Sequence, residues 1–138
     1  MYDHGMLPPI LALITWTFVL WVWMYATRIP AIRRANVDIE ALARTGGSLE
    51  LPPKVSRVAD NYNHLHEQPT LFYALALAAH LAGTADAVSI GLAWGYVLVR
   101  VVHSLIQATV NIIMLRFLVF SVGSVVLLVL LLRTVLML

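Results

Sequence analysis

The sequence contains no cysteine in its 138 residues. Disulfide bonds, thiolate nucleophiles and cysteine-ligated metals are therefore excluded, and any thiol chemistry has to arrive with a ligand. Charged residues are also scarce, at 12% of the chain compared with about 25% in an ordinary soluble domain. Because the formal net charge is only +2, we expect no nucleic-acid partner.

Long uncharged stretches account for most of the sequence. The chain is 61% hydrophobic, and no Asp, Glu, Lys or Arg occurs in residues 7–27, 70–85, 87–99 and 117–132. A helix needs about 20 mostly apolar residues to cross a bilayer, because its backbone groups find no water there. We therefore predict one domain over residues 1–138, an all-α membrane protein built as a four-transmembrane-helix bundle.

Prolines and glycines suggest where the helices begin and end. The predicted spans cover about 7–29, 69–83, 87–109 and 112–136. Pro30 is expected to stop the first span, and residues 30–56 form a polar loop with at most one short interfacial helix. The second helix is expected to begin at Pro53, to stand in water over 53–68, and to kink at Pro69.

The distribution of basic residues predicts the orientation. Most of them flank the long loop, namely Arg28, Arg33, Arg34, Arg44, Lys54 and Arg57, and Arg116 lies near the break between the last two spans. Since positive residues concentrate on the cytoplasmic side, the loop should be cytoplasmic and both termini should lie outside the cytoplasm. We expect a multi-pass protein of a bacterial inner membrane.

Polar residues gather on one face of the segment 57–68. At 100° per residue, six polar side chains share about one third of the helix surface. They are Arg57, Asp60, Asn61, His64, Glu67 and Gln68. Asn63 and His66 fall on the opposite side of this helix.

A second polar seam runs along the third span, within the uncharged region. It comprises Tyr96, Arg100, His103, Ser104, Gln107 and Asn111. An unpaired arginine inside a membrane costs at least about 2.5 kcal/mol, so Arg100 should point into the bundle and find a carboxylate or a ligand. Asp60 and Glu67 are the only acids placed to pair with it. The simplest alternative is structural, because interhelical polar contacts also fix helix register.

Metal binding is not expected. His64, Glu67 and His103 carry suitable ligand atoms. However, di-iron sites in helical bundles use about four carboxylates together with Glu-x-x-His pairs, and only two acids are available here.

Several short motifs together resemble the MAPEG family, the membrane-associated proteins in eicosanoid and glutathione metabolism. The motifs cover most of the chain and are of moderate specificity individually. They are Arg57 and Asn61 leading to Glu67 and Pro69, then Trp94, Tyr96, Arg100 and His103, then Arg116-Phe117 with Gly123.

The resemblance implies a homotrimer of four-helix subunits that binds glutathione between neighbouring subunits near the cytoplasmic surface. Glutathione would be a co-substrate, and Arg116 would be the catalytic residue that stabilises its thiolate. The residues implied to bind it are Arg57, Asn61, Glu67, Tyr96 and Arg100, and His103 and Gln107 stand where many members carry aromatic hydroxyls.

The sequence departs from the family pattern at one spacing. Members usually have three residues from Asn to Glu on the second helix, whereas Asn61 lies six and Asn63 four residues before Glu67. This shift moves the carboxylate around the helix, and the chain resembles a divergent member.

Two functions from different classes follow. The first is a glutathione-dependent transferase or peroxidase that acts on lipophilic electrophiles, with a lipophilic small molecule as second substrate. The alternative is a non-catalytic membrane subunit whose seam binds a lipid, a quinone or a larger membrane complex.

Overall fold

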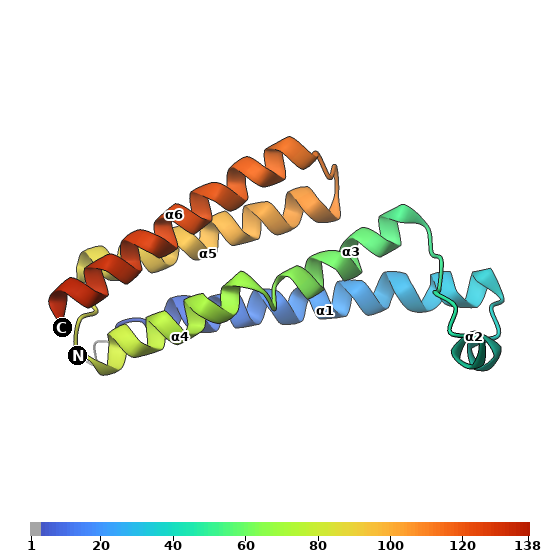
Figure 1. The fold of residues 1–138 in the computed structure, drawn as a ribbon, viewed down its shortest axis with the longest axis horizontal. Coiled ribbons are helices and arrows are strands. Elements are labelled where there is room, and N and C mark those ends of the chain that lie inside the picture. The colour runs from blue at the N-terminus through green and yellow to red at the C-terminus, as the bar shows by residue number, and fades with distance from the viewer. Residues whose placement is uncertain (1–3) are drawn as a thin grey trace.

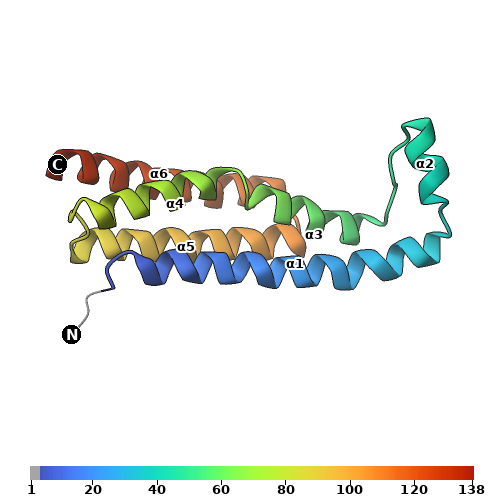
Figure 2. The ribbon, with the colours of Figure 1, turned by 90° about the horizontal axis from the view of Figure 1, so that it is seen from below.

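The computed structural model describes residues 4–138, and these are folded entirely as helices and connecting turns. The helices are α1 (Leu7–Ala35), α2 (Ile39–Thr45), α3 (Pro53–His64), α4 (Gln68–Leu81), α5 (Ala87–Ala108) and α6 (Ile113–Met137). α3 and α4 follow one another along α1, in the direction opposite to it. α5 and α6 then reverse direction in turn, so that these helices lie along one long axis (Figure 1). The start of α1, the α4–α5 turn and the end of α6 lie at one end, whereas α2 extends beyond the other end (Figure 2).

Three of the described helices are long and apolar enough to cross a membrane. They are α1, α5 and α6, with 29, 22 and 25 residues. α4 has only 14 residues and reaches about 21 Å at 1.5 Å per residue, which is shorter than a hydrocarbon layer of about 30 Å. The long apolar helices are those of an integral membrane protein.

The prediction that Pro30 stops the first helix is wrong, because α1 continues to Ala35 with Pro30 inside it. A proline removes only one backbone donor, and membrane helices tolerate that loss where neighbouring groups compensate. The helix ends instead at Asn36, which adopts the left-handed conformation with φ 50° and ψ 40°. Asparagine accepts this conformation more readily than most residues and so serves as a helix stop.

The second helix is broken rather than kinked, which corrects the prediction of one continuous helix through Pro69. α3 ends at His64, and α4 begins at Gln68. In the break, the amide of His66 donates to the carbonyl of Asn63 and that of Glu67 to the carbonyl of His64, in tight three-residue turns. The ring of Pro69 would clash with the carbonyl of Leu65 in a regular helix, which explains the break.

The last two predicted spans are close to α5 and α6. Asp86 begins α5 as its N-cap, accepting a hydrogen bond of 2.8 Å from the amide of Ser89. The same carboxylate forms a 2.7 Å ion pair with Arg133 of α6, which ties the two helices at this end. Gly83 in the preceding turn has φ 72°, a value that favours glycine. The predicted short helix within residues 30–56 is α2.

The core lies where α1, α4, α5 and α6 meet. Its fully buried members include Leu13, Leu20, Phe72, Ala76 and Leu130. α6 approaches α5 closely at Gly123, where an added Cβ would lie 3.3 Å from Val99. Small residues at such crossings allow membrane helices to pack through dispersion contacts.

Candidate functional site

The polar seam of the third predicted span is buried against the other helices, as expected. Arg100, Tyr96 and Ser104 on α5 have no exposed surface, and His103 is 1% exposed. Gln107 is 4% exposed. Because an apolar residue would pack there at lower desolvation cost, this row of buried polar groups requires an explanation.

Arg100 meets a histidine rather than an acid. Its Nη2 atom lies 3.2 Å from Nδ1 of His64, at the end of α3. Among residues 4–138 the ion pairs are Arg44–Glu40 and Arg133–Asp86, so the predicted pairing of Arg100 with Asp60 or Glu67 is wrong for this chain. The break after His64 explains the difference, since it interrupts the helical register that would have aligned residue 67 with residues 57–64.

Two further contacts join α3 to α5. Asn61 is fully buried, and its Nδ2 donates to the carbonyl of Ser104 at 3.3 Å. Arg57, one turn earlier, donates from Nη1 to the carbonyl of Thr109 at 3.1 Å. The polar face predicted over residues 57–64 therefore faces the seam on α5.

Below the break, Gln68 joins three helices. Its Nε2 donates to Oγ of Ser124 on α6 at 2.7 Å, and its Oε1 accepts from the hydroxyl of Tyr96 at 3.2 Å. Tyr96 also stacks on Phe72, with ring centroids 4.7 Å apart. Gln68 lies on the predicted polar face, but sequence reasoning gave it no role.

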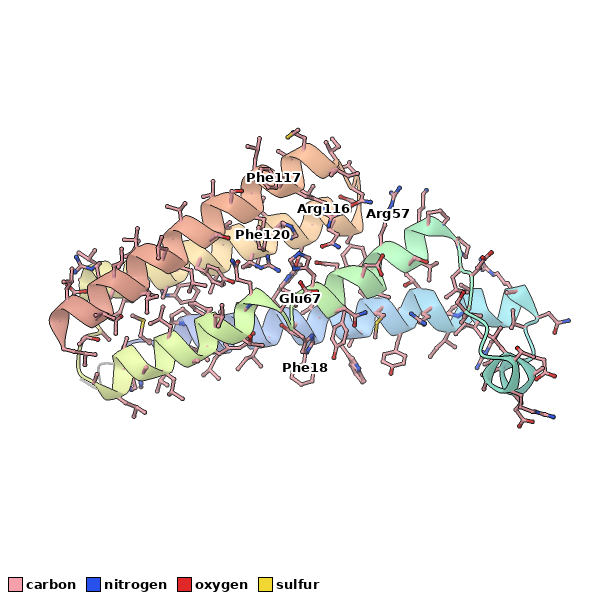
Figure 3. All side chains as sticks on the ribbon, in the orientation of Figure 1. Phe18, Arg57, Glu67, Arg116, Phe117 and Phe120 are labelled. Atoms are coloured by element: carbon pink, nitrogen blue, oxygen red, sulfur yellow. The ribbon has the colours of Figure 1, made fainter. Side chains whose placement is uncertain are left out.

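A recess of about 340 Å³ opens beside these contacts, between α3, α5 and α6. Its lining, which we name the His64 recess, consists of His64, His103, Ile113, Arg116, Phe117 and Phe120. Figure 3 shows Arg116, Phe117 and Phe120 along the first turns of α6. The Nη1 atom of Arg116 donates to Oδ1 of Asn111 at 2.7 Å, which holds its guanidinium in place.

Ring contacts hold His64, His103 and Phe120 together in the lining of the recess. The rings of His64 and His103 are 5.0 Å apart, and Phe120 meets His64 edge-on at 5.6 Å. The recess therefore brings two imidazole rings beside the permanent charge of Arg116.

Several buried polar atoms, at the recess and along the α3–α5 contact beside it, have no hydrogen-bond partner within residues 4–138. They are Nε and Nη1 of Arg100, Nδ1 of His103, Oγ of Ser104, Oε1 of Gln107, Oδ1 of Asn61 and Nε of Arg116. Buried polar groups are normally paired, and leaving one unpaired costs about 1–3 kcal/mol. Groups of this kind are paired by ordered water, by a ligand or by a second chain.

The eight site residues named from the sequence do not all converge. Arg100, His103 and Arg116 lie at the His64 recess or beside it, whereas Arg57, Asn61 and Gln107 lie further along the α3–α5 contact, and Tyr96 joins Gln68. Glu67 is exposed at the break between α3 and α4 (Figure 3).

Sequence reasoning missed His64 as a site residue. It lay on the predicted polar face but was considered only as a metal ligand. Within the described part of the chain, no group of three or more His, Cys, Asp or Glu residues is gathered closely enough to hold a metal ion. The spacing of His64 from Arg57 and Asn61 was the signal that could have found it.

Comparison with known proteins agrees with the resemblance in the motifs. Neither the curated proteins nor the solved structures gave a match to this chain. A family model, described as the MAPEG family, matches residues 6–136, which is nearly the whole chain. The chain therefore belongs to the MAPEG family.

Proposed function

We propose that the protein is a glutathione-dependent enzyme that conjugates or reduces lipophilic electrophiles. The observation that carries the proposal is the group of unpaired buried polar atoms at the His64 recess and the α3–α5 contact, with Arg116 lining the recess and Arg100 behind His64. Glutathione has two carboxylates, an amine and a thiol, and arginine binds carboxylates through paired hydrogen bonds. Arg100, Arg57 and Asn61 would bind its charged ends, and Glu67 would face its amine.

Arg116 is proposed to stabilise the thiolate. It lies in the first turns of α6, and its guanidinium lines the recess. An adjacent cation lowers the pKa of a thiol, and the positive end of a helix acts in the same direction. The nucleophile would then be present at neutral pH, although the chain itself has no cysteine.

Both proposed reactions, conjugation and peroxide reduction, balance in atoms and electrons with glutathione as the reactant. In conjugation, the thiol proton leaves to water, the sulfur lone pair forms the carbon–sulfur bond, and the leaving group departs with its bonding pair. In peroxide reduction, two glutathione molecules supply two electrons. They become the disulfide, while the peroxide takes up two protons and yields an alcohol and water.

A neighbouring groove suits the hydrocarbon part of such a substrate. A space of about 530 Å³ between α4 and α6, which we name the apolar groove, is lined by Gln68, Leu71, Ala74, Leu75, Ser124, Leu127, Leu128 and Leu131. The α6 residues of this groove lie on the same helix face as Arg116 and Phe120, because they recur at spacings of three and four. A lipophilic electrophile in the groove would therefore have its polar end directed along α6 toward Arg116.

The membrane arrangement is also part of the proposal. α3 and α4 together would make the fourth crossing, because they run along α1 in one direction although α4 alone is short (Figure 2). The long loop would be cytoplasmic and both termini outside, and three copies would assemble so that a neighbouring chain helps to complete the unpaired groups at the recess.

The direct test measures glutathione binding and turnover in detergent. Glutathione at about 100 times its Kd should stabilise the protein by about 2.7 kcal/mol. With a chromogenic electrophile, Arg116→Ala should lower kcat/KM by about 100-fold or more, as expected for loss of a group that stabilises developing charge. Arg133→Ala, which removes a cation from the other end of α6, is the matched control and should retain activity.

If Arg116→Ala is as active as wild type, the thiolate role is wrong. If glutathione causes no melting shift and the protein copurifies at fixed stoichiometry with a larger membrane complex, the subunit alternative holds instead. The same unpaired donors would then bind a lipid, a quinone head group or a partner chain.

A further inference from the structure

A second recess, far from the site described above, lies where α1 leaves the apolar part of its sequence. It has a volume of about 610 Å³ and lies between the last turns of α1 and the start of α3. Its lining, which we name the Arg34 recess, consists of Ala26, Thr27, Pro30, Ala31, Arg34, Ala35, Pro52, Lys54 and Val55. The recess exists because α1 continues past Pro30 and so brings Arg34 alongside Lys54.

The recess combines an apolar wall with two free cations. Ala26, Ala31 and Val55 provide apolar surface, and Arg34 and Lys54 provide the charge. Within residues 4–138, neither cation takes part in an ion pair. The surrounding segment 28–57 has a net charge of +3, from six basic residues, Arg28, Arg33, Arg34, Arg44, Lys54 and Arg57, and three acidic ones, Asp38, Glu40 and Glu50.

The position of the recess matches the boundary of a bilayer. Ala26 and Thr27 close the uncharged stretch 7–27, and Arg34 follows one residue short of the end of α1. Seven residues of helix from Thr27 to Arg34 rise about 10 Å, enough to pass through a headgroup layer of about 5–7 Å on each side. Ala26 and Thr27 therefore lie at the edge of the acyl chains, and Arg34 lies at the level of the phosphate groups.

From this juxtaposition we propose that the Arg34 recess binds one anionic phospholipid. Its phosphodiester is held between Arg34 and Lys54, its glycerol and ester region lies against Ala31 and Val55, and one acyl chain extends past Ala26. Arginine and lysine both bind phosphate, and the apolar wall selects a lipid over a free anion. The lipid also fills the space between α1 and α3, so that its binding stabilises this end of the bundle.

The experiment compares melting temperatures of the full chain in detergent with added dioleoylphosphatidylglycerol, dioleoylphosphatidylcholine or inorganic phosphate. The anionic lipid should stabilise the protein at concentrations where the zwitterionic lipid does not. The double variant Arg34→Gln/Lys54→Gln should weaken the apparent affinity by about 30-fold, which corresponds to about 1 kcal/mol for each lost cation. Arg33→Gln/Arg44→Gln removes the same charge from the same segment outside the recess and should leave the affinity unchanged.

Two further variants keep the test independent of folding defects. The charge-retaining exchange Arg34→Lys/Lys54→Arg should preserve the lipid effect. Ala31→Trp, which fills the apolar wall and leaves both cations in place, should remove it. An equal loss in the Arg33/Arg44 control would overturn the proposal in favour of diffuse charge attraction. Equal stabilisation by inorganic phosphate, or full lipid binding by Ala31→Trp, would also overturn it.

Discussion

Nη2 of Arg100 on α5 lies 3.2 Å from Nδ1 of His64 on α3, and this contact determines the protonation of the histidine. A guanidinium has only donors and stays charged in proteins, so Nδ1 of His64 must carry a lone pair and accept. The proton of the neutral ring is then on Nε2. His64 therefore contributes a donor to the recess that it lines beside Arg116.

Two substitutions of His64 test whether its acceptor for Arg100 stabilises the protein. His64→Asn keeps an acceptor near the position of Nδ1, so Arg100 retains a partner and the free energy of unfolding should fall by less than about 1 kcal/mol. His64→Leu removes the acceptor and leaves another charged nitrogen of Arg100 unpaired, which should cost about 2–3 kcal/mol. Denaturant unfolding in detergent measures both values, and equal losses would show that the contact does not stabilise the protein.

Arg100 should lower the stability of the ligand-free protein and strengthen the binding of glutathione. It is completely buried, and two of its nitrogens have no partner within the described residues, so it costs desolvation free energy that an apolar side chain would avoid. Arg100→Met, with a similar length and no charge, should stabilise the ligand-free protein by about 1–4 kcal/mol. The same variant should lose the stabilisation by glutathione. If Arg100→Met melts below wild type, the arginine has a structural role instead.

Asp86 should contribute to stability in two separable ways at the opposite end of the bundle. Its carboxylate accepts from the amide of Ser89 and pairs with Arg133. Asp86→Ser retains an N-cap acceptor without the charge, whereas Asp86→Ala removes both. The melting temperature should fall from wild type to Asp86→Ser and further to Asp86→Ala, and amide exchange in the first turn of α5 should be fastest in Asp86→Ala. Identical behaviour of the two variants would mean that only the ion pair matters.

Much of the helical organisation could be predicted from the sequence. Charge-free runs mark α1, α5 and α6, because charged side chains are costly in a bilayer. Asp86 marks a helix start and Gly83 a turn, because each suits the local backbone conformation. Periodicity also placed Arg100, His103 and Gln107 on one buried face. These features depend on the nature and spacing of neighbouring residues, which a sequence displays.

The partners of those residues could not be predicted in the same way. A helical wheel treats residues 53–82 as one rigid helix, and on that basis Glu67 was expected near Arg100. The break at residues 65–67 leaves Glu67 exposed and gives the contact to His64. Similarly, Pro30 alone suggests a helix end, whereas α1 packs against α3 and continues to Ala35, which creates the recess at Arg34 and Lys54.

The sequence by itself determined the chemical character of this protein: apolar helices, two polar faces, no cysteine and a basic long loop. Only the tertiary structure decided which polar groups meet, where Arg116 lines a recess and where cations stay unpaired. The physical reason is that residue spacing specifies direction along one helix, whereas contacts between helices depend on breaks, crossing positions and packing that arise from the whole chain.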